Sequence, residues 1–433
     1  MGGSAFSSGT DPLFTPRMPP PVYDKMRKHC TALLSNLFRT VASPIDGPGK
    51  SDFGDVDMMV CGPIEVQTTL QDVAEVLDAR RSIFYGCRSA NFALEWPLSD
   101  CSDEEEKEVE EEKQEEEGSE KTKQRKNRYV QVDVCVCPDD DALSWLLFIH
   151  AHGDLGSILR SIVSPYGLTM AEHGLFIRIP EMEASRPKQA RVFITRDPNT
   201  SLQIFGLPAE RFWSGPFADA DDMFEFASLC PMFSAGGVDD DGGDDDDKDH
   251  KRRLRTRPVF RRWTVEFRSG CRRKGLFLQP RTSRESMTES IMKSFPSVRA
   301  AYTDRRFGFL REQQERRIRN ELIPPFASAS AAKQEDTRPH IVVAHRACIS
   351  KALARLVLSD EESFVDSQGV VVKSPDDGFV DAESGLYDLD RVEAFVREHC
   401  DAVAVFAMER HWATMRTRLA ARPRQREQGE EEL

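Results

Sequence analysis

The sequence predicts an α+β fold, in which a small mixed β-sheet flanked by helices precedes a mostly helical C-terminal domain. The chain has 433 residues, enough for two or three domains. Short apolar segments with the pattern of strands occur between residues 55 and 195. After about residue 205 the apolar residues recur at helical spacing. We therefore expect the sheet in the first half of the chain and helices in the second.

The acidic excess of the chain is confined to two short runs. The chain has 59 Lys and Arg against 73 Asp and Glu, a net charge of −14. Residues 100–121 carry a net charge of −10 and residues 239–249 one of −7, which leaves the rest at +3. Blocks of like charge are typically solvated, so we expect two disordered acidic insertions, over 100–128 and 236–257. The acidity therefore does not exclude a protein that handles phosphate groups.

Composition also predicts the domain organisation and the compartment. We expect a disordered Pro-rich arm over 1–21, a first folded domain over 22–200, a mostly helical domain over 201–421 and a disordered tail over 422–433. No apolar stretch is long enough to cross a membrane, and the N-terminus has no apolar signal-peptide core. The ten cysteines lack zinc-type spacing. We expect an intracellular protein, cytoplasmic or nuclear, with reduced thiols and no membrane partner.

Periodicity and chain-breaking residues place the individual elements. Apolar residues three and four apart predict a first helix over 22–41, which Pro44 ends, and a second over 66–77. Apolar runs between polar clusters predict five strands, 55–60, 91–96, 129–136, 174–179 and 191–195. Further helices are expected over 143–149, 155–163, 221–229, 299–319 and 345–358.

Two of the predicted strands carry acidic residues among apolar ones. Asp55 and Asp57 are two positions apart, so their side chains share one face of the strand, with Val56 on the other. Asp133 lies in the third strand, flanked by valines. Adjacent carboxylates repel one another unless cations lie between them. If the two strands are neighbours, three carboxylates converge, an arrangement that suits a Mg²⁺ or Mn²⁺ site for phosphoryl transfer.

A glycine-rich turn precedes the first of these strands. Gly47, Gly49 and Gly54 have no side chains, so backbone N–H groups of the turn can approach phosphates closely. Lys50 adds a positive charge in the same turn. These residues are therefore candidates to bind a nucleoside triphosphate, and the alternative for Lys50 is a solvated loop lysine. Asp52 precedes the strand and is a weaker ligand candidate.

These features together resemble a known superfamily. A helix, a glycine turn, Asp-x-Asp on a strand and a later strand aspartate resemble the polymerase-β-like nucleotidyltransferases. The longer context, over about residues 22–235 and more loosely 299–326, resembles a nucleotidyltransferase-like family of fungal and phage proteins. The matching segments are Ser51-Asp-Phe-Gly-Asp-Val-Asp57, Asn91-Phe-Ala93, Val130-Gln-Val-Asp-Val134, His150-Ala-His-Gly-Asp-Leu155, Tyr166-Gly-Leu-Thr169, His173-Gly-Leu-Phe-Ile-Arg178, Phe205-Gly-Leu207 and Phe224-Glu-Phe226.

The resemblance implies a function, although the glycine turn of this chain departs from the superfamily pattern. By resemblance, Asp55, Asp57 and Asp133 are the metal-binding, catalytic triad of a Mg²⁺-dependent enzyme that transfers a nucleoside monophosphate from a nucleoside triphosphate to a hydroxyl acceptor. The superfamily usually has Gly-Gly or Gly-Ser at the turn, whereas this chain has Gly47-Pro48, and proline donates no N–H. The phosphate contact then moves to Gly49-Lys50, or transfer is lost. The alternative function is a catalytically degenerate nucleotide- or nucleic-acid-binding scaffold.

A basic segment follows the second acidic run. Residues 251–284 carry 13 Lys and Arg against one acid, and aromatic residues are interspersed among them. Positive charge with stackable rings is typical of nucleic-acid binding, so this segment is expected to contact a nucleic-acid acceptor. The alternative is a basic linker that pairs with the acidic run. The aromatic residues are Phe260, Trp263, Phe267 and Phe277.

Two further groups have open alternatives. Arg80, Arg81 and Arg88 could reach a triphosphate, but the first two are better explained as the basic end of a helix. His150 and His152 could share a zinc ion, or they could pack in a turn.

Overall fold

The structure is a computed structural model that describes residues 3–9, 11–97, 127–236, 251–333, 338–359, 363–365, 369 and 371–420. Most of both expected acidic insertions, and the expected tail over 422–433, lie outside the described residues. The predicted α+β class is confirmed: a mixed sheet with helices precedes a mostly helical region. The chain divides into two compact units, Met1–Pro180 with Lys188–Val298, and Glu181–Pro187 with Arg299–Leu433.

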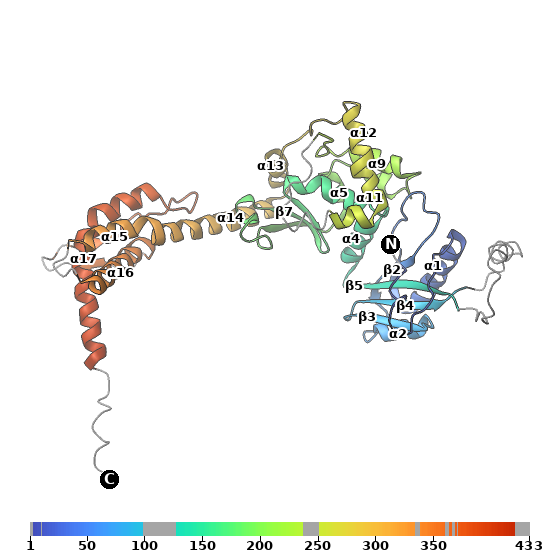
Figure 1. The fold of residues 1–433 in the computed structure, drawn as a ribbon, viewed down its shortest axis with the longest axis horizontal. Helices are drawn as coiled ribbons and strands as arrows, with labels where there is room; N and C mark the ends of the chain where they lie inside the picture. The colour runs from blue at the N-terminus through green and yellow to red at the C-terminus, as the bar shows by residue number, and fades with distance from the viewer. Residues whose placement is uncertain are drawn as a thin grey trace, which may run out of the picture. The chain divides into compact units, whose positions relative to one another are not determined.

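The first unit contains a five-stranded mixed sheet of order β1-β2-β5-β4-β3 (Figure 1). β2 and β5 pair in parallel, and every other neighbouring pair is antiparallel. Two segments distant in the chain therefore lie side by side in the sheet. The strands are β1 (Phe38–Ala42), β2 (Asp55–Pro63), β3 (Arg81–Tyr85), β4 (Ser89–Glu95) and β5 (Tyr129–Cys137).

Two helices cover one face of this sheet. Alternate residues of β2, β4 and β5, among them Val56, Phe92 and Val132, are fully buried against α1 (Pro20–Leu34) and α2 (Leu70–Val76). α1 begins with proline at its first positions, where the ring fits the helix, and α2 begins with a capping box. Since side chains alternate along a strand, the residues between the buried ones point to the opposite face.

The elements differ from the predicted ones mainly at the sheet edges. The first helix ends at Leu34, and residues 38–42 form β1 instead, because this short segment pairs with β2. β3 is a strand that the sequence does not predict, so Arg81 lies in an edge strand and not at the end of a helix. Short edge strands carry little apolar alternation, which hides them from pattern analysis.

Helices and a second sheet complete the first unit. This antiparallel sheet has the order β6-β7-β8. Its strands are β6 (Leu168–Ala171), β7 (Gly174–Arg178) and β8 (Arg191–Thr195). The helices are α4 (Asp140–His150), α5 (Leu155–Val163), α7 (Pro198–Ile204), α8 (Ala209–Trp213), α9 (Ala220–Ser228), α11 (Pro258–Arg262), α12 (Arg268–Arg273) and α13 (Arg284–Ser294).

Aromatic packing explains why the first unit extends beyond the boundary predicted at residue 200. Phe224 of α9 and Trp263 are fully buried, with ring centroids 5.4 Å apart. Helices on both sides of the second acidic run therefore share one core. Residues 251–256, which were expected within an insertion, are helical.

The N-terminal residues pack onto the sheet and do not form the expected free arm. We call residues 3–9 and 11–18 the N-terminal strap. Phe6 is 1% exposed and packs with Ala93 and Tyr129, and the backbone of Met18 exchanges hydrogen bonds of 2.7 and 2.9 Å with that of Phe53. An apolar residue among Gly and Ser gives no periodic signal, so composition alone could not predict this docking.

The second unit is mostly helical, as expected for the C-terminal part. Ile318, Leu353 and Val396 are fully buried in its core. Residues 181–187 belong to this unit because Arg186 donates two hydrogen bonds of 2.7 Å to the carboxylate of Glu312. The elements are α6 (Pro180–Glu183), α14 (Pro296–Arg317), a π-helical turn (Ile318–Leu322), α15 (Ile323–Ala331), α16 (Pro339–Leu358), β9 (Ser363–Val365), β10 (Val371–Lys373) and α17 (Leu389–Ala420).

Within the described parts of the chain, no helix combines the length and the apolar character that crossing a membrane requires.

Replacing Phe6 with Ala tests whether the N-terminal strap contributes to folding. We expect the free energy of unfolding to fall by about 3 kcal/mol, because a fully buried ring is removed. Phe14→Ala is the matched control, since the Phe14 side chain is 47% exposed and should cost less than about 1 kcal/mol. Urea denaturation of both variants measures the difference, and equal losses would contradict the burial of Phe6.

Candidate functional site

The parallel pairing of β2 and β5 places the three predicted acids on one face of the sheet. Asp57 lies opposite Asp133, and Asp55 lies opposite Gln131. Asn91 of β4 pairs with Asp133 from the other side. Opposed residues of neighbouring strands point to the same face, and the helices α1 and α2 cover the other one. The three carboxyl groups therefore lie on the face that those two helices leave free.

The protein raises the pKa of all three carboxyl groups. Asp57 reaches solvent, yet the protein atoms around it reduce its hydration and, with the nearby charge of Asp55, raise its pKa to about 6. Burial raises the pKa of Asp133 to about 7. The hydrogen bond from Gln131 lowers this pKa, and the charges of Asp55 and Asp57 raise it further. Burial also raises the pKa of Asp55, against the positive charge of Lys50. The three carboxyl groups are thus harder to ionise in the folded protein than in water, mainly because they are desolvated.

The carboxyl groups share a face without forming a closed ligand set. In the described part of the chain, no three His, Cys, Asp or Glu side chains are arranged to hold a metal ion. Oδ1 of Asp133 accepts a hydrogen bond of 2.9 Å from Nε2 of Gln131, and the Gly3 backbone hydrogen-bonds to Asp55. The chemistry fits a divalent cation, because three crowded carboxylates are the oxygen ligands that Mg²⁺ prefers. Ligation would require the carboxylate oxygens that these hydrogen bonds leave free to close around the cation.

The predicted glycine turn lies beside the carboxylates. The charge of Lys50 opposes the rise in the pKa of both Asp55 and Asp57, so its ammonium group lies near the two acids. Gly49 has a φ of +64°, a conformation that glycine adopts without strain. Gly54 is buried immediately before Asp55. The turn therefore brings backbone and one cation to the edge of the acidic face.

The turn that contains His150 and His152 supports the glycine turn. His152 is fully buried, and its Nε2 lies 2.9 Å from the Phe212 carbonyl oxygen. Its backbone N–H donates to the Ile45 carbonyl at 2.7 Å. Burial lowers the pKa of His152 to about 4, so it stays neutral. The packing role predicted as one alternative for His152 fits this geometry, and a shared zinc site does not.

A Cβ atom on Gly47 would lie 3.5 Å from the Cα of Gly153. This is an ordinary van der Waals distance, so the two turns lie in contact at this position.

Several residues of this region were not singled out from the sequence. The ring of Tyr23 in α1 stacks on Phe53 at 3.7 Å, and its hydroxyl donates to Asp46 at 2.9 Å. Arg27 also lies 3.6 Å from Asp46, so α1 holds the start of the turn. Gln131 hydrogen-bonds to Asp133, and its spacing of two residues from that acid was the available signal.

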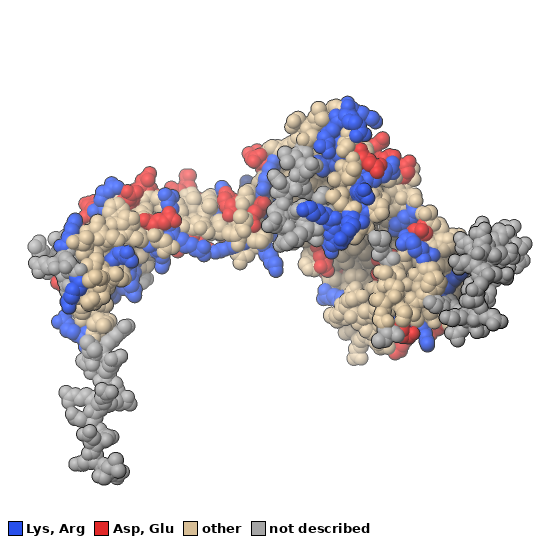
Figure 2. Space-filling model, in the orientation of Figure 1, with Lys and Arg blue, Asp and Glu red and all other residues tan. Residues whose placement is uncertain are grey.

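The basic segment exposes many of its cations but buries two of its aromatic rings. Phe260 is 0% and Trp263 1% exposed, so neither ring can stack on a base as predicted, whereas Phe277 is 37% exposed. Lys and Arg side chains gather over α12, where Arg272, Arg273 and Lys274 are exposed (Figure 2). We call these three residues the α12 basic patch. The patch offers charge to a polyanion, and the exposed Phe277 lies three residues beyond it in the chain.

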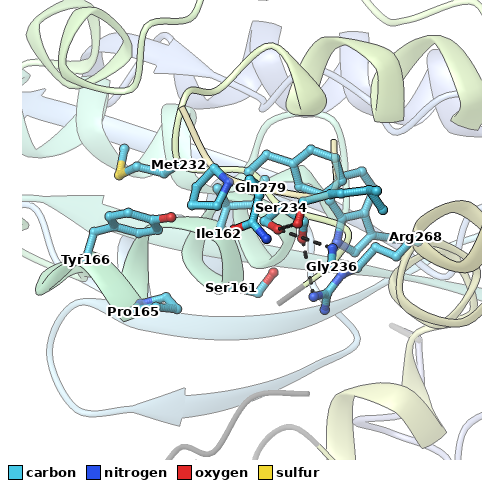
Figure 3. Close-up of a pocket in the computed structure, with 13 residues that line it drawn as sticks. Ser161, Ile162, Pro165, Tyr166, Met232, Ser234, Gly236, Arg268 and Gln279 are labelled. Carbon is cyan, nitrogen blue, oxygen red and sulfur yellow. Dashed lines mark hydrogen bonds between the residues drawn. The ribbon is translucent and has the colours of Figure 1, made fainter. Parts of the chain in front are cut away.

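A separate pocket of about 280 Å³ lies in the first unit (Figure 3). Tyr166 and Met232 lie toward one end of it and Arg268 toward the other. None of its lining residues comes from β2, β5 or the glycine turn. The pocket is therefore distinct from the carboxylate face.

Comparison with known proteins gives only a weak structural likeness. No family model and no curated protein sequence matches the chain. Two solved structures of Leishmania infantum polymerase beta, a ternary P/T complex and a ternary gap complex, are similar to 45% of this chain, at 13% sequence identity and a TM-score of 0.31. The matched region covers 74% and 68% of the respective polymerase chains. A likeness at this level carries no functional conclusion, so the site geometry has to support any proposal.

The raised pKa values predict a pH-dependent stability that a cation should reverse. The folded pKa values of Asp57 and Asp133, about 6 and 7, exceed the unfolded value of about 4. Between about pH 4 and pH 7 the folded protein therefore binds more protons than the unfolded chain does. The stability contributed by these groups therefore falls as the pH rises from about 4 to 7.

We expect Asp57→Asn to raise the thermal midpoint at pH 7.5 without added cations, and to raise it less at pH 5, where only part of the pH-dependent loss of stability has occurred. At pH 7.5, added Mn²⁺ should raise the midpoint of the wild-type protein more than that of the variant. Scanning calorimetry at the two pH values measures this. Glu65→Gln, an exposed acid in the turn after β2, is the control and should behave as wild type. A lower midpoint for Asp57→Asn at pH 7.5 would contradict the electrostatic assignment.

Proposed function

We propose that the first unit is a Mg²⁺-dependent nucleotidyltransferase, which transfers a nucleoside monophosphate from a nucleoside triphosphate to a hydroxyl acceptor and releases pyrophosphate. One observation carries the proposal: the parallel register that sets Asp57 beside Asp133, with Asp55 on the same face. The glycine turn with Lys50 lies at the edge of that face. The three acids and the groups that we propose to bind phosphate thus lie near one another.

Each residue of the face has a role in this proposal. Asp55, Asp57 and Asp133 would hold the divalent cation, which when bound supplies the positive charge that stabilises the transferring phosphoryl group. Asp133 belongs to the strand between β2 and β4, and it would orient the acceptor hydroxyl and receive its proton. The exposed position of Asp57 leaves the face open to a ligand.

The glycine turn would bind the triphosphate. Lys50 is a cation near two of the acids, and the backbone of Gly49, which has a positive φ, would take the place of the Gly-Ser usual in the superfamily. Backbone N–H groups and a lysine ammonium are donors that phosphate oxygens accept readily. Gly47 and Gly54 would allow the turn to approach the phosphates without a side chain in between.

Transfer assays with Asp55→Asn/Asp57→Asn test the enzymatic proposal. We expect labelled nucleotide to be transferred from nucleoside triphosphates to RNA or protein acceptors in Mg²⁺ or Mn²⁺. Loss of two ligands should reduce transfer by at least ~100-fold, the upper range found for outer-sphere partners of metal ligands. Glu65→Gln should retain full transfer.

A negative transfer result has a defined meaning. If the wild-type protein transfers nothing, yet the wild type and the double variant bind triphosphate equally well, the enzyme proposal fails. The catalytically degenerate scaffold of the same fold is then the function that remains.

The α12 basic patch supports nucleic acid as the acceptor or as a bound partner. Replacing Arg272, Arg273 and Lys274 with Ala should reduce the slope of log affinity against log salt by about 2 for single-stranded RNA, because three phosphate contacts are lost. Lys28→Ala/Arg39→Ala/Lys188→Ala removes three exposed cations elsewhere in the first unit and is the control. Fluorescence anisotropy at several salt concentrations measures the slope for each variant. Equal slopes for the patch variant and the control variant would exclude the α12 basic patch as an RNA-binding site.

A further inference from the structure

We propose that the N-terminal strap is a working part of the carboxylate site, in which its backbone sets the orientation of the Gln131 amide and this amide positions Asp133. The inference rests on the proposed function, because it names the residues that position the carboxyl groups of that site. Its evidence is independent of the reaction and comes from how the strap crosses the sheet.

The strap follows one row of residues across four strands. Register places Arg81, Ala93, Gln131 and Asp55 opposite one another in β3, β4, β5 and β2. The strap contacts every member of this row in turn. Asp11 accepts hydrogen bonds from Arg81, Phe6 packs with Ala93, the Ala5 N–H donates to Gln131, and the Gly3 backbone hydrogen-bonds to Asp55.

The adjacent row contains the other two acids. Ile83, Asn91, Asp133 and Asp57 lie opposite one another, one row further along the strands. Beyond this row, Met59, Cys61 and Cys137 are buried against Leu143 of α4. The row of Asp57 and Asp133 therefore lies between the strap on one side and the residues packed by α4 on the other.

The strap determines which way the Gln131 amide points. Gln131 is 3% exposed, and its Oε1 accepts a hydrogen bond of 2.9 Å from the Ala5 backbone N–H. A backbone N–H can only donate, so the amide oxygen must face the strap. The Nε2 group then faces Asp133 and donates to its Oδ1 at 2.9 Å. With the strap absent, the amide could turn its oxygen toward Asp133 and repel the carboxylate.

Gly3 fixes the end of the strap beside Asp55. Its φ is +87°, and a Cβ atom there would lie 2.2 Å from the Gly54 carbonyl oxygen. The Thr15 hydroxyl donates to the Gly3 carbonyl at 2.7 Å, which ties the start of the strap to its later part. Only glycine fits this position, because any side chain would meet the backbone of the glycine turn.

The consequence is that the strap system supplies one hydrogen-bond donor to each of two carboxyl groups. Asp55 receives the Gly3 N–H, and Asp133 receives the Gln131 Nε2 that the strap has oriented. Donors of this kind fix a carboxylate in one orientation and leave its second oxygen for a cation. Loss of such outer partners typically weakens metal affinity by roughly 10–100-fold.

Mn²⁺ binding to the full chain tests the amide. Gln131→Met keeps the volume of the buried side chain but removes both hydrogen bonds. We expect the Mn²⁺ affinity to fall by roughly 10-fold or more. The electron paramagnetic resonance spectrum of the bound ion should also change, a readout that a purely structural role would not move. Unchanged affinity and spectrum in a folded Gln131→Met protein would overturn the positioning role.

A second pair of variants tests the strap without touching the sheet. Gly3→Ala should displace the strap from Gly54 and weaken Mn²⁺ binding several-fold. Gly9→Ala is the matched control, because Gly9 has a similar positive φ of +108° but open space where the Cβ would lie. Equal Mn²⁺ affinities for the two variants would overturn the role of the strap, even if Gln131→Met proves too unstable to measure.

The two proposals fail in different ways. The cation site of the proposed function is wrong if the wild-type protein does not bind Mn²⁺, or if Asp57→Asn leaves Mn²⁺ binding unchanged. If that binding exists but Gln131→Met and Gly3→Ala retain it fully, the cation site stands and the positioning role of the strap is overturned.

Discussion

The candidate site depends on one interaction, the parallel hydrogen-bonded pairing of β2 with β5. Because side chains alternate along a strand, a slip of one residue in this pairing would send Asp133 to the face covered by α1 and α2. The buried valines of both strands prevent that slip, since it would also move them out of the core. The apolar face of the sheet therefore fixes the position of the polar one.

The polar face in turn is a compromise between folding and chemistry. Three carboxyl groups with raised pKa values do not favour the folded state at neutral pH, yet they lie where α1 and α2 cannot cover them. The strap and α4 pack on either side of the row that holds Asp57 and Asp133. Unfavourable local charge beside a well-packed core is typical of functional sites.

Local patterns could predict the core of this site but not its surroundings. The Asp-x-Asp spacing and the valines beside Asp133 encode which way these side chains point, so the shared face followed from period-two alternation. The contact between Ala5 and Gln131 uses a backbone group far along the chain, which no pattern at either position reveals. Burial of Phe260 and Trp263 was equally invisible, because composition does not distinguish a stacking ring from a core ring.

The hairpin of β4 and β5 has a consequence for how this chain can change in evolution. Glu95 lies opposite Tyr129, and the Trp96 N–H donates to the Arg128 carbonyl at 3.0 Å, so the hydrogen-bonded pairing of the two strands is complete before their connection begins. Each doubling of such a connection costs only about 0.6 kcal/mol in loop entropy. The segment that joins them can therefore gain or lose many residues while Asp133 keeps its place in the sheet.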